Sequence, residues 1–330
     1  MISLKILSFF LEILTILSLS IVSRATNSNS FIIYDVNTNA VINGNNINER
    51  ALIASTTKIL TAIITIENTD IMSTVEVLKE DTLIEGSKVY LRENEHFTVL
   101  DILHGLMLRS GNDCANLLAR THHSGYQNFI SLMNKKCQEL GMSNSIFKNP
   151  SGLDSQDENY STAYDMALLM SYAIKNEYFK EISSKHSYTA KSIEGTSYFW
   201  ANKDKSVLSD ERFICGKTGY TKASGRILVN YAKAYSRDVI IVTINDSNDW
   251  INHKTYLNSL EKYVDYDIIK KGIYQVKDTS YIVNIKKDIK IPLLKTMKNS
   301  YTYIIYIGNK SYLYVYLHDL FINRYEVFIE

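Results

Sequence analysis

Short runs of apolar residues, separated by polar turns, occur near residue 30 and again after residue 212. Phe31 to Val36 and Ala40 to Ile42 have the length of strands and flank the turn-forming residues Asn37-Thr38-Asn39. This pattern predicts a β-hairpin. Arg226 to Ala232 and Val239 to Ile244 predict a second hairpin of the same kind, preceded by one more short strand.

Between the two hairpins, apolar residues recur every three or four positions, which predicts a series of helices. Two of these begin with a capping pattern, Thr98 with Asp101 and Thr162 with Asp165, in which side chain and backbone satisfy each other at the helix start. The predicted helices cover about residues 55–67, 98–108, 128–140 and 166–174, and a later one covers about 252–263.

The order of these elements predicts the fold class. Strands at both ends of residues 28–265, with helices between them, indicate an α+β domain: an antiparallel sheet forms from both ends and a helical lobe is inserted. After Gly272 the pattern changes, and Tyr301 to Ile307 and Tyr312 to Leu317 alternate like strands. Residues 272–330 are therefore predicted to form a small β-rich C-terminal module.

The first 25 residues have the pattern of an export signal. Lys5 precedes an apolar run from Ile6 to Val22, and Ser23-Arg24-Ala25 supplies small residues at the spacing that a signal peptidase recognises. Glu12 interrupts the run, which argues against a permanent membrane span. Residues 1–25 are therefore predicted to be a signal peptide and the protein to be exported, to the cell wall or the medium. An uncleaved segment would instead be its membrane anchor.

The composition excludes several other classes of protein. With 330 residues and 45% hydrophobic content the chain can fill a sizeable core, and a net charge of +1 gives no basic field for nucleic acid. The cysteines, Cys114, Cys137 and Cys215, are too few and too widely spaced for a disulfide framework. No Cys-x-x-Cys or His-Glu-x-x-His motif is present, so the sequence predicts no metal site.

Lys58 stands one turn into an otherwise apolar predicted helix, three residues after Ser55. Residues at i and i+3 share a helix face, so the amine can reach the hydroxyl. A serine is a poor nucleophile unless a base takes its proton, and lysine becomes such a base only when burial or a second cation lowers its pKa. The same spacing recurs in a predicted loop and within a predicted helix, at Ser145/Lys148 and Ser259/Lys262.

Two further motifs follow along the chain. Ser110-Gly111-Asn112 lies between two predicted helices, where by itself it is typical of a turn. Lys217-Thr218-Gly219 ends a predicted strand. Lysine and threonine can bind a carboxylate there, and glycine lets a ligand approach the backbone. A peptide that ends in a free carboxylate would lie along such an edge strand.

Together and in this order, the three motifs resemble those of the low-molecular-mass penicillin-binding proteins that are serine-type D-alanyl-D-alanine carboxypeptidases. The matching residues are Ser55-Thr56-Thr57-Lys58, Ser110-Gly111-Asn112 and Lys217-Thr218-Gly219, and the stretches NPSGLD, STAYDMALLM and GKTGYTKASGR are similar as well. The resemblance covers roughly residues 28–265 and implies the penicillin-binding/β-lactamase-like transpeptidase fold.

The resemblance implies hydrolysis of the terminal D-Ala-D-Ala bond of peptidoglycan stem pentapeptides, with no metal or organic cofactor and with covalent inhibition by penicillin. Ser55 would be the nucleophile, Lys58 the general base and Ser110 a proton relay. Backbone N–H groups of Ser55 and Tyr220 would form the oxyanion hole. Substrate binding would fall to Asn112, Lys217, Thr218, Gly219 and Tyr220.

Several alternatives stay open at this stage. A serine β-lactamase shares the serine–lysine site but commonly uses a Glu-x-x-x-Asn glutamate to activate water, and no such pattern lies between the second and third motifs. A non-catalytic β-lactam sensor would stay acylated. A basic residue near the third motif often helps to hold the carboxylate in the family, and His253 or Lys254 is the candidate here. Vegetative wall and spore cortex are both possible substrates, and endopeptidase activity is undecided.

Overall fold

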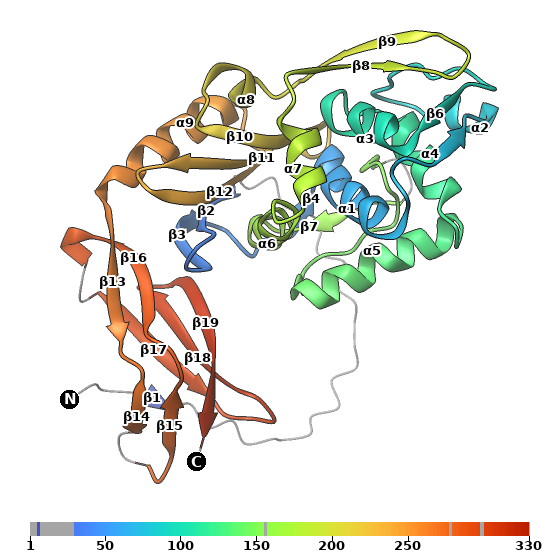
Figure 1. The fold of residues 1–330 in the computed structure, drawn as a ribbon. Coiled ribbons are helices and arrows are strands. Elements are labelled where there is room, and N and C mark those ends of the chain that lie inside the picture. Colours follow the sequence, from blue (N-terminus) through green and yellow to red (C-terminus); the bar gives the residue numbers. More distant parts are fainter. Residues whose placement is uncertain (1–4, 7–29, 155–156, 277–278, 298–299, 330) are drawn as a thin grey trace.

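The computed structural model describes residues 5–6, 30–154, 157–276, 279–297 and 300–329 (Figure 1). The signal-peptide prediction for residues 1–25 therefore lies outside the described residues, apart from β1 (Lys5–Ile6), which pairs in parallel with β17 (Tyr301–Tyr306). Within the described ranges, no helix is both long and apolar enough to cross a bilayer.

A five-stranded sheet in the order β10-β11-β12-β2-β3 forms the centre of the fold, and each neighbouring pair is antiparallel. The strands are β2 (Ser30–Asp35), β3 (Ala40–Asn45), β10 (Phe213–Thr221), β11 (Gly225–Ala234) and β12 (Arg237–Ile244). Both predicted hairpins are present. The sheet is thus built from two distant parts of the chain, as predicted from the order of the elements. Strand β10 lies at its edge.

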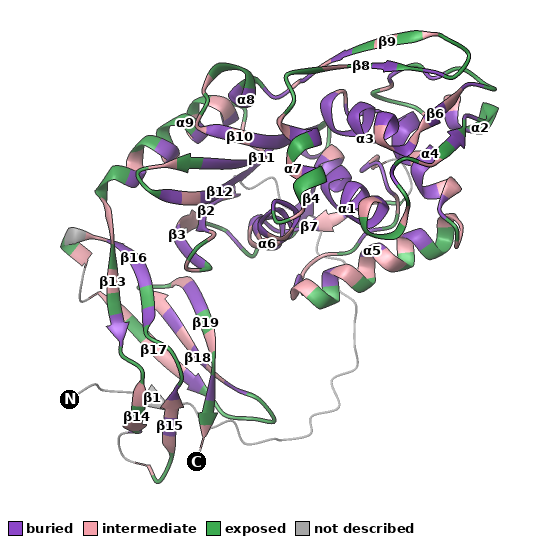
Figure 2. Cartoon of the chain, viewed as in Figure 1, coloured by how far each residue is buried: buried purple, intermediate pink, exposed green. Residues whose placement is uncertain are grey.

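Most helices between these strands form one lobe (Figure 1). They are α1 (Lys58–Asn68), α2 (Lys79–Thr82), α3 (Val99–Leu108), α4 (Asn112–Thr121), α5 (Tyr126–Leu140), α6 (Ala163–Ala173) and α7 (Glu177–Ser184). The short helix α8 (Lys205–Ser209) instead contacts β10 and α9 (Asp249–Ser259). Helix α6 packs on β2, β11 and β12, and α1 contacts α3, α4, α5 and α6. Figure 2 shows α3 and much of α1 buried, so the lobe surrounds α1. This burial explains why Lys58, at the start of α1, lies in an apolar setting.

The two predicted capping patterns are confirmed. Thr98 caps α3 by accepting a hydrogen bond from the N–H of Asp101, whose carboxylate accepts one from the N–H of Thr98. Thr162 accepts a bond from the N–H of Asp165 at the start of α6. Gly141 ends α5 with a φ of 73°, a left-handed conformation that glycine adopts without strain.

Three small two-stranded sheets complete the lobe: β4 (Ala51–Leu52) with β7 (Tyr160–Ser161), β5 (Thr74–Glu76) with β6 (His96–Thr98), and β8 (Ser187–Lys191) with β9 (Ser197–Ala201). The predicted helix over residues 252–263 is wrong in its bounds. Helix α9 covers Asp249–Ser259, and after η2 (Leu260–Lys262) the chain becomes β13 (Tyr263–Ile269). The β-branched and aromatic residues that follow residue 262 favour a strand.

The C-terminal part of the chain is β-rich, as predicted. β13 pairs with β16 (Ile289–Leu294), and a second sheet has the order β1-β17-β18-β19-β15-β14. Its remaining strands are β14 (Gly272–Gln275), β15 (Ile282–Ile285), β18 (Ser311–Leu317) and β19 (Leu320–Ile329), with η3 (Lys295–Met297) before β17. β16 and β19 contact β3 of the central sheet. The division into residues 28–265 and 272–330 stays a prediction.

Candidate active site

Ser55 lies in a single turn of 3-10 helix, η1 (Ala54–Thr57), directly before α1. Ala54 has a φ of 43°, an uncommon conformation for alanine that redirects the chain into the turn. Lys58 is the first residue of α1 and is completely buried, with its Nζ 3.0 Å from Ser55 Oγ. The predicted serine–lysine contact is therefore present in the folded chain.

Lys58 donates two further hydrogen bonds, to Asn112 Oδ1 at 2.7 Å and to the Ser151 carbonyl at 2.5 Å. Burial, and then the positive charge of Lys217, lowers the pKa of Lys58 well below the usual lysine range. The amine is thus fixed in direction by three acceptors while its proton is weakly held. The sequence motifs did not reveal the Ser151 carbonyl, because a backbone acceptor carries no side-chain signature.

The Ser110-Gly111-Asn112 motif joins α3 to α4, as predicted. Ser110 has a φ of 63°, and its Oγ lies 3.0 Å from Lys217 Nζ. Asn112 binds Lys58 through Oδ1 and donates from Nδ2 to the Glu85 carbonyl at 2.7 Å. Both side-chain polar atoms of Asn112 are therefore engaged within the protein, where they fix the position of Lys58.

Lys217, Thr218 and Gly219 lie on edge strand β10, which passes close to η1. A side chain at Gly219 would place a Cβ 3.2 Å from the Ile53 carbonyl oxygen and 3.3 Å from the Thr56 nitrogen, tighter than most packed contacts. Glycine therefore allows strand β10 to approach the turn that carries the nucleophile.

A cleft of about 330 Å³ lies over these motifs. Its lining residues are Ser55, Ser87, Ser110, Lys203, Thr218, Gly219, Tyr220, Arg226, Asp249 and Trp250. Five of the predicted site residues thus line one cleft, and the other three are buried beside it. Lys58 and Lys217 donate hydrogen bonds to the cleft residues Ser55 and Ser110, and Asn112 is bonded to Lys58.

Arg226 is a cleft residue that the motifs did not identify. It pairs with Tyr220 across the β10–β11 hairpin, and its Nη2 donates to both carboxylate oxygens of Asp249 at 2.8 and 2.9 Å. Its guanidinium lies 4.2 Å from the ring centroid of Trp250. The sequence could have indicated Arg226 through the turn after Tyr220, because a hairpin there pairs Arg226 with the end of the third motif.

The candidates for a carboxylate-binding base, His253 and Lys254, require correction. His253 is fully buried and makes hydrogen bonds with Thr243 Oγ1 at 3.0 Å and Asn230 Oδ1 at 2.8 Å. Burial lowers its pKa to about 3, so the ring is neutral. Lys254 is exposed on α9, and neither residue lines the cleft. Helix α9 directs His253 onto the central sheet, against Thr243 of β12 and Asn230 of β11.

Asp113 was also missed. Its buried carboxylate accepts backbone N–H bonds from Val89 and Tyr90, and so holds in place the segment that contributes Ser87 to the cleft.

The three cysteines are free and buried, which makes them core residues. Among the residues that the structure describes, no group of histidine, cysteine or acidic side chains is arranged to hold a metal.

Lys217 is expected to make stability depend on pH. Burial, and then the charge of Lys203, lowers its pKa to about 7, whereas a lysine in an unfolded chain has a pKa of about 10.4. Between these values only the unfolded chain carries the proton, so this lysine makes the free energy of unfolding rise with pH. Lys217→Met should remove a slope of up to about 1.4 kcal/mol per pH unit, measured by urea unfolding. Exposed Lys222 provides the control, Lys222→Met; equal slopes in both variants would refute the assignment.

A family model for D-alanyl-D-alanine carboxypeptidases, peptidase family S11, matches residues 19–248. The chain therefore belongs to this family. The match confirms the resemblance carried by the three motifs and disfavours the β-lactamase and sensor alternatives.

Individual relatives agree with this assignment. The chain is 29% identical over 228 residues to D-alanyl-D-alanine carboxypeptidase DacF of Bacillus subtilis, covering 68% of this chain but only 58% of that protein. It is 33% identical over 214 residues to D-alanyl-D-alanine carboxypeptidase DacB2 of Mycobacterium tuberculosis, covering 64% and 72%. The crystal structure of the carboxypeptidase DacD from Francisella tularensis matches 93% of this chain and 94% of its own, with a TM-score of 0.71; at 21% identity this likeness shows the fold alone.

Proposed function

We propose that the protein removes the terminal D-alanine from peptidoglycan stem pentapeptides through an acyl-enzyme on Ser55. The observation that carries this proposal is the pair of contacts across one cleft, Lys58 Nζ to Ser55 Oγ and Lys217 Nζ to Ser110 Oγ, each 3.0 Å long. Family membership supplies the reaction class, and the pair supplies a base beside the nucleophile and a donor beside the leaving group.

In the acylation step, the neutral amine of Lys58 takes the proton of Ser55 as Ser55 Oγ bonds to the D-Ala-D-Ala carbonyl. The N–H groups of Ser55 and Tyr220 stabilise the oxyanion. Ser110 passes a proton to the leaving amine, free D-alanine departs, and water then attacks the acyl-enzyme to release a tetrapeptide stem. None of these steps calls for a metal or organic cofactor.

Substrate orientation comes from the other cleft residues. Strand β10 has a free edge beside Thr218, Gly219 and Tyr220, along which an extended peptide can add by backbone hydrogen bonds. Lys217, Thr218 and Arg226 provide positive charge and a hydroxyl for the terminal carboxylate. We assign Asn112 mainly to fixing Lys58, since both of its polar side-chain atoms are engaged in the protein.

The cleft favours a carboxypeptidase over a β-lactamase. Rapid deacylation of a β-lactam needs a carboxylate free to activate water. Asp249 is the carboxylate that lines the cleft within the described ranges, and it is bound to Arg226 through both oxygens. Penicillin is therefore expected to acylate Ser55 and to leave slowly, as an inhibitor.

The deciding experiment is turnover of a synthetic pentapeptide that ends in D-Ala-D-Ala. Release of D-alanine together with covalent labelling by penicillin identifies a carboxypeptidase. Rapid hydrolysis of penicillin would identify a β-lactamase, and labelling without peptide turnover would identify a sensor. Comparing cross-linked with uncross-linked peptides separates endopeptidase from carboxypeptidase activity.

The substrate also determines where the protein works. Peptidoglycan lies outside the cytoplasmic membrane, so we propose that the protein acts there. The apolar run and the Ser23-Arg24-Ala25 site support export through residues 1–25.

Arg226 is expected to determine how well the terminal carboxylate is bound. A hydrogen bond to a charged group contributes roughly 1.5–3 kcal/mol, so Arg226→Gln should lower kcat/KM for the pentapeptide by roughly 10- to 100-fold. Arg226→Lys should recover part of the loss. The control is Arg212→Gln, which changes an arginine paired with Asp210 outside the cleft. A pentapeptide amide, which has no terminal charge, should be equally poor with parent and Arg226→Gln; a selective loss with the amide would contradict this role.

A further inference from the structure

A second and larger cavity, about 750 Å³, lies between the helical lobe and the C-terminal sheet. One wall is formed by residues 46–49, the end of α5 and the start of α6, and the other by β18, β19 and the turn between them. We call this cavity the interdomain groove. It shares no residue with the cleft over Ser55, so the proposed reaction leaves it without a role.

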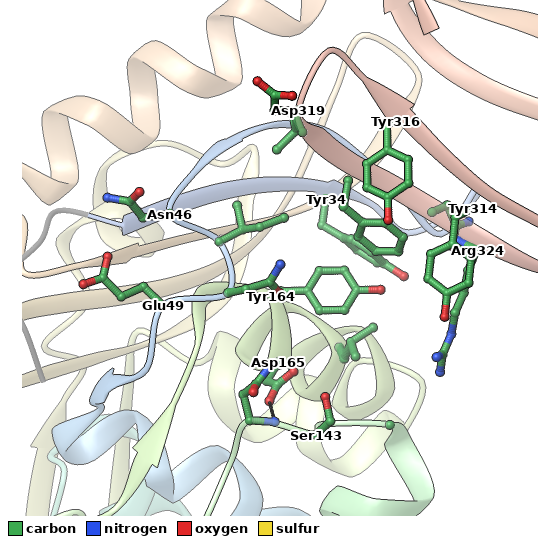
Figure 3. A pocket seen from close by; sticks show the side chains of 18 of the residues that line it. Tyr34, Asn46, Glu49, Ser143, Tyr164, Asp165, Tyr314, Tyr316, Asp319 and Arg324 are labelled. Atoms are coloured by element: carbon green, nitrogen blue, oxygen red, sulfur yellow. Dashed lines mark hydrogen bonds between the residues drawn. The ribbon is translucent and has the colours of Figure 1, made fainter. Parts of the chain in front are cut away.

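Aromatic rings run across the interdomain groove from one wall to the other. Tyr34 is 6.3 Å from Tyr164, Tyr164 is 5.5 Å from Phe321, and Phe321 is 5.9 Å from Tyr316, measured between ring centroids. Tyr316 in turn stacks with Tyr314 at an interplanar angle of 15°. Figure 3 shows Tyr34, Tyr164 and Tyr316 close together, with Asn46 and Glu49 to one side and Arg324 to the other.

The hydroxyls of Tyr34 and Tyr164 in the groove are hydrogen-bond donors and acceptors. Burial raises the pKa of Tyr164 to about 12 and raises that of Tyr34 further. Around them lie the side-chain amides of Asn46, Asn48 and Asn144. The groove therefore combines the partly exposed aromatic rings of Tyr164, Tyr314 and Tyr316 with uncharged hydrogen-bonding groups.

Charge around the groove disfavours an anionic ligand. The carboxylates of Glu49 and Asp319 lie on its walls, and Arg324, on the opposite side in Figure 3, is the arginine among the described lining residues. Asp165 is used internally, since it accepts bonds from the Asn144 N–H and the Ser145 hydroxyl. Nucleic acid and other polyanions would meet repulsion here.

We propose that the interdomain groove binds a neutral polysaccharide, the glycan strand to which the stem peptides are attached. A sugar ring has an apolar C–H face that packs on an aromatic ring and a rim of hydroxyl and amide groups that needs hydrogen-bond partners. The lining of the groove supplies both. The choice of this polymer rests on the proposed function, because stem peptides reach the enzyme as branches of a glycan.

The interdomain groove and the cleft over Ser55 are close together in the sequence, as expected if one polymeric substrate occupies both. Glu49 on the groove wall is six residues before Ser55. Six extended residues span at most about 20 Å, so the groove wall lies within that distance of the nucleophile. A five-residue stem in extended form covers about 17 Å. A glycan in the groove would then hold its own stem peptides near Ser55, which would favour polymeric substrate over free peptide.

The test uses a hexamer of β-1,4-linked N-acetylglucosamine, which has no peptide and cannot use the catalytic cleft. Binding to the full exported protein is measured by NMR titration. Saturable binding is expected, and Tyr316→Ala should weaken it about tenfold through loss of one stacking contact. Tyr316→Phe keeps the ring and should bind nearly as well as the parent. Asp319→Ala, in the exposed β18–β19 turn, should also weaken binding.

Tyr178→Ala is the matched control, because Tyr178 is an exposed tyrosine on α7 outside the groove. Tyr316→Ala should also lower turnover of polymeric peptidoglycan. Turnover of free pentapeptide and labelling by penicillin should be unchanged, and these two results would show that the variant is folded. Absence of hexamer binding, or equal weakening by Tyr178→Ala, would overturn the proposal, as would stronger binding of a lysine-rich peptide at the groove. Failure of penicillin to label Ser55 would overturn the proposed function separately, since hexamer binding is measured without it.

Discussion

Replacing Ser55 by alanine is expected to abolish both covalent labelling by penicillin and release of D-alanine from a pentapeptide. Both reactions form a bond to Ser55 Oγ, and no second hydroxyl is 3.0 Å from the Lys58 amine among the described contacts. Removal of a nucleophile lowers turnover by several orders of magnitude, on the order of 10⁶ where it has been measured in other serine enzymes. Mass spectrometry of the penicillin adduct and an assay for free D-alanine measure the two effects.

The matched control is Ser259→Ala. Ser259 has the same spacing to a lysine, but it lies near the end of α9 and its hydroxyl donates to the Tyr256 carbonyl. This variant should keep full labelling and full turnover. Labelled penicillin that remains on the Ser55→Ala protein would show that the nucleophile has been misassigned.

Replacing Lys58 by methionine is expected to lower the rate of acylation by roughly 10²- to 10⁴-fold, the usual contribution of a general base. Methionine keeps the apolar stem but has no amine to take the Ser55 proton. Because Lys58 is the group whose lowered pKa lets it act as a base, the residual activity should also lose the rise with pH that deprotonation of Lys58 gives the parent.

Stopped-flow labelling with a fluorescent penicillin across a range of pH measures both the rate and its pH profile. Lys262→Met is the control, since Lys262 completes the Ser259 pattern but is exposed. Loss of Lys58 leaves the Asn112 and Ser151 acceptors without their donor, so the variant is also expected to unfold at lower urea concentration. A rate and pH profile equal to those of the parent would exclude Lys58 as the base.

The central sheet and the catalytic motifs could be predicted because their signals are local. Short apolar runs on either side of turn residues marked β2, β11 and β12, and the Thr98 and Thr162 caps marked two helix starts. Ser55 and Lys58 lie within one turn of each other, so their contact follows from helix geometry alone. The contact between Lys217 and Ser110 spans 107 residues, and only the family resemblance indicated it beforehand.

Other features had no local signal. The Ser151 carbonyl reaches Lys58 only because the loop after α5 folds back on α1, and every residue has a carbonyl. Arg226 required the hairpin register, whereas the family pattern indicated a basic residue after the following strand, where His253 and Lys254 lie. The β8–β9 hairpin was missed because its alternation is weak. Only Ala190 and Trp200 are buried in it, and of these two only Trp200 has a large apolar side chain.

If β-lactams acylate Ser55 as proposed, the glycine contacts at the turn that carries Ser55 restrict how drug resistance could arise. Gly152 has a φ of 83°, and a side chain there would place a Cβ 1.8 Å from the Ala54 carbonyl oxygen. Gly219 is similarly confined against the turn that carries Ser55. At these two glycines main chain packs on main chain. A substitution there would move Ser55 and so impair the reaction with the substrate as well as the reaction with the drug. Viable changes that discriminate against a β-lactam are therefore confined to the rim, where Tyr220 is 65% exposed and Arg226 is half-buried.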